Sequence, residues 1–546
     1  MNDFDRPTSP HIRHVRVTKW RLPLAAIERT CVRALMAIAL VPALLALPAC
    51  KSPSEQAAAL AAQADAQAAA GNLVAAREAI SEAIALRDGV PQYYQLRGAI
   101  AMQAGDTIGA YRAFQRVLEF DTTNQMALAY VANVSMQIGQ IAEGEDAADR
   151  LLTLDPNAVP ALQVKGMIAL SRDKYEDAEQ IADRILTIRA ADEAGTIIKA
   201  RAMAKKGQVE DALKLLDTAM AAAQESPALL TNKLNLYRNL KQPEQMGAML
   251  EKLVALDKSS PAVRLDQINL LYKLGKTDEA RTAAVNLLTL GSGSPDDYRT
   301  LQRLWADYDK TPIPAGPASN SSGWKDPLAI LLTARYLIAQ GDLKTADALV
   351  SSAPARARPL VASLKARFLA ASRRGDEARQ QIDAQLKTDT HDVDALLLRA
   401  LMATNQRQMD VAVEAAQLAQ ANDPLNAETY VILARIFRAQ GANQRARQVF
   451  EDGVKNLPQN FTVLENYTQF LHESGDKGRA VSVARAFARG TPSSVRAWSI
   501  LAVQCQRAGD RTCLESALAG RKNAENTYLV DDPPGAPPNR GLFGRI

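Results

Sequence analysis

Residues 91–120, PQYYQLRGAI AMQAGDTIGA YRAFQRVLEF, have the pattern of two short amphipathic helices joined by a tight turn. Apolar and aromatic residues recur at helical spacing from Tyr93 to Ile100 and again from Ala110 to Phe114. Gly105 lies between the two runs, where a helix often ends in a left-handed residue and glycine adopts that conformation at the lowest cost. The stretch therefore predicts a pair of helices.

The same unit recurs with a period of 34 residues. Its turn position is glycine in ten of thirteen copies, although glycine makes up 28 of the 546 residues. Small residues, mostly alanine, recur five positions after the turn and seven positions before it, where they let two helices approach closely. The turn positions are Gly71, Gly105, Gly139, Asp173, Gly207, Lys241, Gly275, Gly341, Gly375, Arg407 (two residues early), Gly441, Gly475 and Gly509.

Proline stands where the first helix of several copies is expected to begin, and serine precedes it in three of them. The fixed backbone angle of proline suits a first helical turn, and a serine hydroxyl can cap that turn. The prolines are Pro91, Pro227, Pro261, Pro295 and Pro327, and the serines are Ser226, Ser260 and Ser294.

A 34-residue period with small residues at these places resembles the tetratricopeptide repeat. Large residues typical of the family also match in places, at Tyr94, Phe114, Phe450 and Trp498. The resemblance covers about residues 57–528. It implies an all-α fold, a right-handed α-solenoid of helix-turn-helix repeats with a long concave inner surface.

The period fails once. Pro295–Asp309 still has the pattern of a first helix, but residues 310–323 hold three prolines and a polar run and cannot form its partner. We therefore predict a first array over 57–308 (seven repeats and an orphan helix), a linker or surface loop over 309–326, and a second array of six repeats over 327–528. The arrays could share one axis or be oriented separately. Residues 529–546 lack periodicity and are predicted to be a disordered, proline-rich tail.

Residues 1–49 have the order of a secretory signal peptide, a basic stretch followed by an apolar run and small residues. The run ends Leu47-Pro48-Ala49-Cys50, which resembles the lipobox of bacterial lipoproteins. That resemblance implies cleavage before Cys50, acylation of Cys50 and a polar tether over 50–56. An ordinary cysteine after an ordinary signal is the alternative. Lys51 in place of aspartate favours the outer membrane, with the protein facing the periplasm, over the inner membrane.

The formal charge of +5 is concentrated in the predicted signal peptide. Residues 1–49 hold seven basic and three acidic residues, whereas the rest of the chain holds 58 and 57. A nearly neutral mature chain argues against nucleic acid as a partner. His391 and His472 are the histidines that follow the signal, and neither lies in a metal-spaced cluster. We therefore expect no enzyme activity, no cofactor and no metal site.

Cys505 and Cys513 flank the turn of the last copy, at the end of one predicted helix and the start of the next. An envelope compartment allows such a pair to oxidise. We predict a disulfide that staples the final repeat; two buried thiols are the alternative.

The family resemblance also suggests a binding surface. In tetratricopeptide repeats, positions 2, 5, 9 and 12 of the first helix line the inner surface, and here position 9 is often asparagine or arginine. Asparagine can bond a peptide backbone and arginine can pair with carboxylates, although exposed positions can also simply be polar. Leu369 and Leu401 interrupt this column in the second array. The predicted groove residues are Asn133, Arg201, Asn232, Asn235, Asn239, Asn269, Arg303 and Arg335.

Together these features predict a lipid-anchored periplasmic scaffold or adaptor that binds proteins or extended peptides of an envelope assembly or export machine. Exopolysaccharide export is favoured, because its scaffolds use long arrays. The alternatives are a glycan- or peptidoglycan-binding lipoprotein, for which Tyr272 would supply an aromatic platform in the groove, an adaptor that recruits envelope hydrolases, and a pilus or secretion assembly factor.

Overall fold

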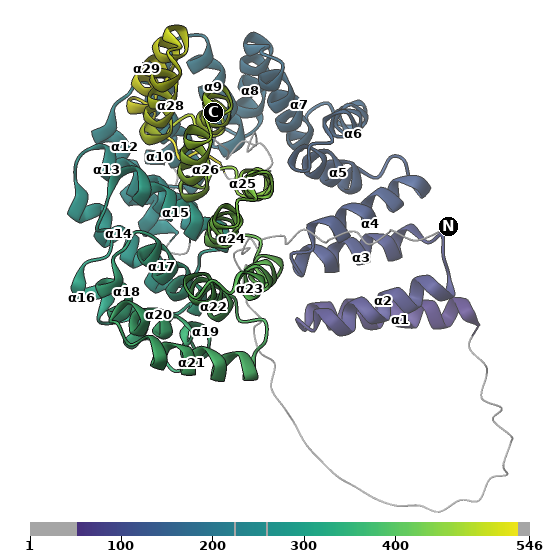
Figure 1. The fold of residues 1–546 in the computed structure, drawn as a ribbon. Helices are drawn as coiled ribbons and strands as arrows, with labels where there is room; N and C mark the ends of the chain where they lie inside the picture. Colours follow the sequence, from purple (N-terminus) through teal and green to yellow (C-terminus); the bar gives the residue numbers. More distant parts are fainter. Residues whose placement is uncertain (1–51, 223–224, 258–259, 533–546) are drawn as a thin grey trace, which may run out of the picture. The chain divides into compact units, whose positions relative to one another are not determined.

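The computed structural model describes residues 52–222, 225–257 and 260–532. These residues form helices in consecutive helix-turn-helix pairs, so the all-α repeat architecture predicted from the sequence is confirmed (Figure 1). The chain divides into two compact units, 1–223 and 224–546, called unit 1 and unit 2 below. The predicted lipidation site, Cys50, lies outside the described residues.

Unit 1 consists of five successive helix pairs, and each helix packs against its neighbours in the chain. Its helices are α1 (Pro53–Ala69), α2 (Leu73–Leu86), α3 (Pro91–Gln103), α4 (Thr107–Phe120), α5 (Gln125–Gln137), α6 (Ile141–Leu154), α7 (Val159–Ser171), α8 (Tyr175–Ile188), α9 (Glu193–Lys205) and α10 (Val209–Ala222).

Unit 2 continues the same arrangement but contains several short elements near its middle. Its helices are α11 (Pro227–Asn239), α12 (Pro243–Leu256), α13 (Pro261–Lys273), α14 (Thr277–Leu290), α15 (Pro295–Tyr308), α16 (Ala315–Ala318), the 3-10 turn η1 (Ser321–Gly323), α17 (Pro327–Ala339), α18 (Leu343–Ser351), α19 (Arg358–Val361), α20 (Leu364–Ala371), α21 (Gly375–Thr388), α22 (Val393–Asn405), α23 (Met409–Asn422), α24 (Ala427–Ala439), α25 (Asn443–Asn456), α26 (Phe461–Glu473), α27 (Lys477–Gly490), α28 (Val495–Ala508) and α29 (Arg511–Glu525).

Left-handed residues end the first helix of the pairs, as the 34-residue period predicts. The three turn positions that are not glycine have this conformation too, with φ of 59° at Asp173, 53° at Lys241 and 60° at Arg407. The prediction was wrong at Gly375, which begins α21; the left-handed residue is Arg373, with φ of 61°. The irregular step therefore falls between Gly341 and Arg373, where α18, α19 and α20 are short.

The helix starts also follow the sequence signals. Each of the five prolines named above is the first residue of its helix. The hydroxyls of Ser226 and Ser294 accept hydrogen bonds from the backbone N–H groups of Leu229 and Asp297, whereas Ser260 makes no such bond.

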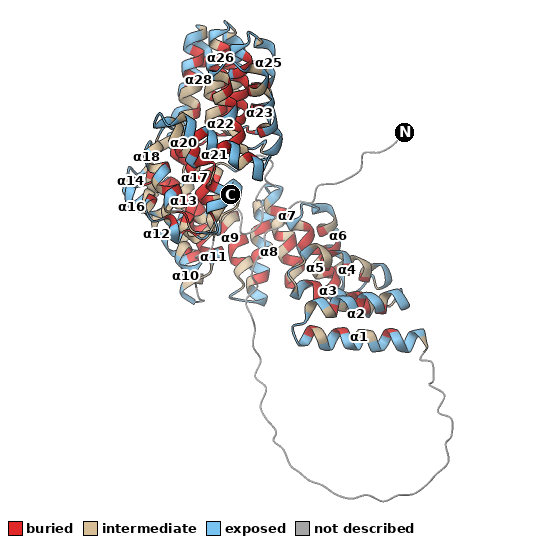
Figure 2. Cartoon of the chain, turned by 60° about the horizontal axis from the view of Figure 1, so that its bottom comes forward, coloured by how far each residue is buried: buried red, intermediate tan, exposed pale blue. Residues whose placement is uncertain are grey.

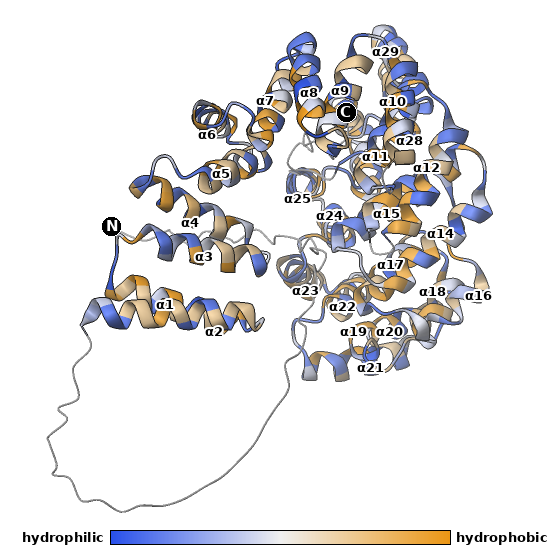
Figure 3. Ribbon diagram, turned by 180° about the vertical axis from the view of Figure 1, so that it is seen from behind, coloured by the Kyte–Doolittle hydropathy of each residue, from blue (hydrophilic) through white to orange (hydrophobic). Residues whose placement is uncertain are grey.

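The core consists of small and aliphatic residues buried between neighbouring helices (Figure 2). Alanines five positions after the turns, such as Ala76 and Ala212, are fully buried where two helices pack closely. A larger side chain at these positions would push the helices apart. In unit 2 the mostly hydrophobic helix α17 buries Ile330, Leu331 and Leu337 (Figure 3).

The segment 309–326, expected to be a linker or surface loop, is packed into unit 2. Ile313, Ala318 and Trp324 are at most 4% exposed and belong to the same apolar cluster as residues of α13, α15 and α17. Its prolines exclude a regular second helix, and its short helix α16 packs against α18.

The start of the predicted tail also differs from expectation. Residues 529–532 contact unit 2, and Val530 is 4% exposed, so this part of the tail is ordered; residues 533–546 lie outside the described residues. Cys505 and Cys513 form a disulfide with a Cα–Cα distance of 5.6 Å, in agreement with the sequence prediction. None of the helices in the described ranges is long and apolar enough to cross a membrane.

Candidate functional site

Two of the predicted groove residues lie in unit 1. Asn133 on α5 is exposed, and its side-chain oxygen accepts a hydrogen bond from Nε2 of Gln137 at 2.8 Å. Arg201 on α9 is half-buried, and burial lowers its pKa to about 10.

The four predicted groove asparagines of unit 2 are mostly buried rather than exposed. Asn232 and Asn235 on α11 are 1% and 3% exposed, and Asn269 on α13 is 2% exposed. Asn232 donates to the backbone carbonyl of Ala228 at 2.9 Å, within its own helix. Asn239, on the same helix, is exposed. Their helical spacing thus places three of the four at the inner packing surface of the unit.

Arg238 connects these asparagines to a distant part of the chain. Its guanidinium donates to the side-chain oxygen of Asn235 and pairs with Asp266, both at 2.8 Å. Its Nε donates to the backbone carbonyl of Tyr528 at 3.2 Å. An arginine held by two partners in this way is fixed in position to bind a third.

Tyr528 belongs to a short segment, residues 524–532, that leaves the end of α29 and lies against unit 2. We call it the C-terminal segment. After α29 its residues have no regular secondary structure. Four side chains from different elements donate to its backbone carbonyls: Lys273 to Ala524 at 2.7 Å, Arg238 to Tyr528 at 3.2 Å, Arg303 to Asp531 at 2.7 Å and Gln459 to Asp532 at 2.9 Å.

Two side chains of the C-terminal segment are also held. Val530 lies in the apolar cluster that contains Tyr298, Leu301 and Trp305 of α15. The carboxylate of Asp531 accepts hydrogen bonds from the hydroxyl of Ser493 at 2.7 Å and from its backbone N–H at 3.2 Å. The segment is therefore bound through its backbone carbonyls and through two side chains, the apolar one of Val530 and the acidic one of Asp531.

A second long-range contact lies beside this segment, where α15 packs against α28. The Ser494 hydroxyl donates to Asp307 at 2.6 Å, and Arg496 donates to the backbone carbonyl of Ala306. Burial raises the pKa of Asp307 to about 6, although Ser494 and the nearby guanidinium groups of Arg303 and Arg496 oppose the rise. Burial likewise lowers the pKa of Lys273 to about 8.

A cavity of about 310 Å³ lies between α15, α17 and the turns that precede α24 and α26. Arg303 and Gln459, which hold the C-terminal segment, also line this cavity, together with Tyr336 and Phe461. Arg303 donates to the side-chain oxygen of Gln459, so the two residues form one polar unit between the cavity and the segment.

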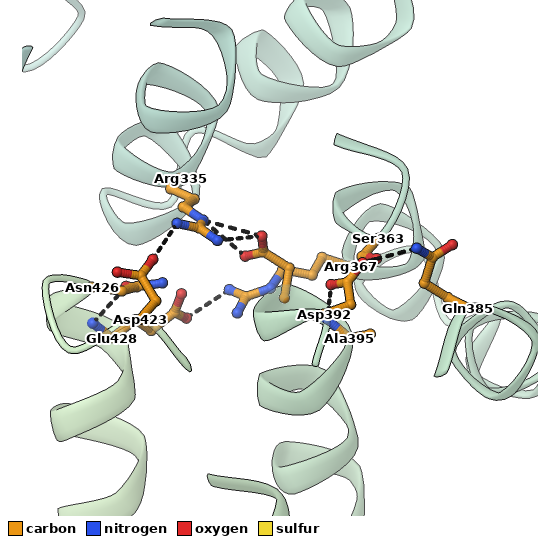
Figure 4. A network of polar contacts seen from close by, with 10 residues as sticks. Arg335, Ser363, Arg367, Gln385, Asp392, Ala395, Asp423, Asn426 and Glu428 are labelled. Atoms are coloured by element: carbon orange, nitrogen blue, oxygen red, sulfur yellow. Dashed lines mark hydrogen bonds and ion pairs between the residues drawn. The ribbon is translucent and has the colours of Figure 1, made fainter. Parts of the chain in front are cut away.

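Arg335, also predicted for the groove, belongs to a separate polar network (Figure 4). It pairs with Asp394 of α22 and with Asp423 at the end of α23, both at 2.8 Å, and these carboxylates raise its pKa. Its contacts thus connect α17 to the following repeats.

Arg367 is the equivalent position one repeat later, and the sequence prediction missed it. It is 7% exposed and pairs with Glu428 at 2.6 Å (Figure 4). The sequence prediction placed Leu369 in this column because it took Gly375 as the turn. Counting back 34 residues from Arg407 would have given Arg373 as the turn and Arg367 as the column residue.

Within the described ranges, no group of three or more His, Cys, Asp or Glu side chains is arranged to hold a metal ion. Tyr272, the predicted aromatic platform, is 6% exposed; its hydroxyl donates to Asp309 at 3.1 Å and its ring stacks on Tyr308.

Residues 406–461, which cover α23 to α25, match the sequence profile of the tetratricopeptide repeat family. This part of the chain carries a tetratricopeptide repeat. No match was found among curated protein sequences.

Several solved structures are similar at low sequence identity. A tetratricopeptide repeat protein from Parabacteroides merdae is 18% identical, covering 46% of this chain and 98% of its own, with a TM-score of 0.40. PilF of Pseudomonas aeruginosa is 14% identical over 38% and 96%, with a TM-score of 0.31. YrrB, described as a tetratricopeptide repeat protein with an unusual peptide-binding site, is 17% identical over 30% and 84%, with a TM-score of 0.27.

Proposed function

We propose that this protein is a scaffold of the bacterial cell envelope that holds protein partners through peptide segments bound to unit 2. Tetratricopeptide repeats bind proteins and peptides and are typically non-catalytic.

The observation that carries the proposal is the bound C-terminal segment. Three side chains from separate elements of unit 2, Arg238, Arg303 and Gln459, donate to backbone carbonyls of the part that follows α29, and Lys273 donates to Ala524 in the last turn of that helix. Backbone carbonyls are common to every peptide, so a surface with donors at these places can hold a segment of another protein in the same way. The bonds of Arg238 and Arg303 are charge-assisted, which makes them stronger than neutral ones.

The anchor is proposed from the sequence alone. The run Leu47-Pro48-Ala49-Cys50 supports acylation of Cys50 and attachment to the outer membrane, with the repeats in the periplasm. A Cys50→Ser variant should move from the membrane fraction to the soluble periplasmic fraction and should lose labelling by a fatty-acid probe. Retention of both properties by the variant would remove the anchor from the proposal.

Among envelope machines we favour exopolysaccharide export, because of the length of the repeat array. The buried position of Tyr272 weighs against the alternative of a glycan-binding surface, which needs accessible aromatic rings. A pilus, secretion or hydrolase-recruiting adaptor would use the same peptide-binding surface, and identification of the captured partner distinguishes between them.

The test is crosslinking of the full-length protein in membranes, followed by identification of captured proteins. An Arg303→Ala, Gln459→Ala variant should capture at least tenfold less partner, because it lacks two of the backbone donors. Arg374→Ala is the control, since Arg374 of unit 2 is exposed, pairs with its neighbour Glu377 and does not line the cavity. Equal capture by both variants, or recovery of glycans without any protein, would overturn the proposal.

A further inference from the structure

The C-terminal segment is itself a peptide ligand whose contacts include two that depend on side-chain chemistry. The four backbone contacts described above would accept many sequences. Val530 and Asp531 add selectivity, because one is buried in an apolar cluster and the other is bound through its carboxylate.

The position occupied by Val530 requires an apolar side chain. Val530 is 4% exposed among aromatic and aliphatic side chains of α13, α15 and α17. Burial of an aliphatic side chain stabilises by roughly 1.5–3 kcal/mol, whereas a polar group placed there without a hydrogen-bond partner is costly. This position therefore selects an aliphatic residue.

The following position selects an acid. Both donors of Ser493, the hydroxyl and the backbone N–H, bond the Asp531 carboxylate. Burial raises the pKa of Asp531, and the charge of Arg303, the bonds from Ser493 and the charge of Lys273 oppose that rise. An amide in place of the carboxylate would keep one acceptor oxygen but would bring two N–H donors and no charge. The surface thus recognises an aliphatic residue followed directly by aspartate.

In the structure, the chain's own segment occupies this surface. It accepts hydrogen bonds from Arg303 and Gln459, which also line the cavity, so a partner peptide cannot bond the same two donors while the segment is in place. Because the segment is covalently attached to α29, its effective concentration is high, on the order of millimolar for a short tether. A partner must therefore outcompete it.

We infer that the part of the C-terminal segment that follows α29, residues 527–532, acts as a built-in competitor, and that the partner is a protein segment in which an aliphatic residue is followed by aspartate. This inference rests on the proposed peptide-binding function of unit 2 and adds its selectivity and its regulation. A partner with the same pair displaces the segment, whereas a peptide without it leaves the segment bound.

The test uses the full-length protein and a fluorescent peptide with the sequence of residues 524–532, AENTYLVDD, amidated at its C-terminus so that it carries no extra carboxylate. A double variant, Val530→Ser with Asp531→Asn, releases the chain's own segment. Fluorescence anisotropy should show that this variant binds the peptide at least tenfold more tightly than the unaltered protein does.

Three controls define the result. A peptide carrying the same two substitutions should not bind the release variant at millimolar concentration. Adding Ser493→Ala to the release variant should weaken binding of the unaltered peptide. Thermal unfolding and circular dichroism check that each variant is folded.

The unaltered protein gives a further readout. An excess of peptide should displace its own segment and so speed amide hydrogen exchange at residues 527–532.

Equal peptide affinity of the unaltered protein and the release variant, or no binding to a folded release variant, would show that the segment is a fixed structural element and would overturn the inference. The proposed function is judged separately by partner capture in membranes. Capture that persists while the peptide fails to bind would reject the competitor alone, and peptide binding without capture would reject the function alone.

Discussion

The two compact units are built from the same kind of helix pair but differ in how far their polar contacts reach along the chain. In unit 1, Arg172 and Lys165 bond Glu145 of the preceding repeat, 27 and 20 residues away. In unit 2, Arg496 contacts a residue 190 positions away, and Arg238 one 290 positions away. Stability in a stack of repeats comes from neighbouring pairs, so unit 1 should unfold in stages, whereas long-range contacts should make unit 2 unfold as one body.

The largest effect should come from a core substitution that separates these two behaviours. Leu301 on α15 and Leu128 on α5 are both fully buried, and replacing either by alanine should cost about 2–5 kcal/mol. We expect Leu301→Ala to increase amide exchange throughout unit 2, but Leu128→Ala to increase it in the neighbouring repeats of unit 1. Hydrogen exchange read by mass spectrometry checks both, and an equally local response in the two variants would remove the distinction.

The ends of the array differ as well, since Cys505 and Cys513 link α28 to α29 whereas residues 52–222 contain no cysteine. Replacing both by serine should lower the local stability of α29 by about 2 kcal/mol, because the linkage closes a short loop. The readout is amide exchange of α29, and exchange in α1 and α2 serves as the control. Thiol labelling of the unreduced, denatured protein should find no reactive cysteine at these positions; two labelled thiols would contradict the disulfide.

A smaller effect is expected from one ion pair in each unit. Arg496 pairs with Glu465 at 2.6 Å, lies over the ring of Phe461 and bonds α15, so Arg496→Ala should cost about 1.5 kcal/mol. Arg172 pairs with Glu145 at the same distance but is half exposed, so water screens the pair and Arg172→Ala should cost less than Arg496→Ala. Urea unfolding of the two variants compares these costs, and a larger loss for Arg172→Ala would reverse the comparison.

Much of unit 1 could be predicted from the sequence because its contacts repeat with the period. Spacing alone identified a left-handed turn at Asp173 in unit 1, and another at Lys241 in unit 2, where the residue type gives no such signal. At Gly375 the residue type gave a wrong prediction of the turn. Spacing from Arg407 places the turn two residues earlier, at Arg373, which has the left-handed conformation.

The candidate site could be predicted in part, for a physical reason. The period placed Asn235, Asn269 and Arg303 on the inner side of unit 2, where they are buried. It could not predict that Val530 and Asp531 pack there, because their partners lie up to hundreds of residues away and no local pattern encodes a contact across that distance. Prolines in 309–326 likewise excluded a regular helix without excluding the burial of Trp324.

The smallest expected effect is a difference in pH response between the units. Burial raises the pKa of Asp307 in unit 2 to about 6, above its ordinary value of 3.8, so the folded state binds more protons than the unfolded chain between about pH 4 and 6. The pKa of Glu145 in unit 1 is lowered to about 2, chiefly by its hydrogen bond with Arg172, so its contribution is complete above about pH 4.5 and is lost only in stronger acid.

Acidification from pH 7 to pH 5 should therefore stabilise unit 2 by about 1 kcal/mol and leave the Glu145 contribution in unit 1 unchanged. Asp307→Asn should abolish the gain, because the amide keeps the hydrogen bond with Ser494 but does not titrate. Hydrogen exchange of α15 and α28, measured at both pH values and corrected for the intrinsic rate, follows unit 2, while α6 and α7 follow unit 1. If the Asp307→Asn variant still gained stability, the proton would be bound elsewhere, and Asp531, whose pKa burial also raises, is the next group to replace.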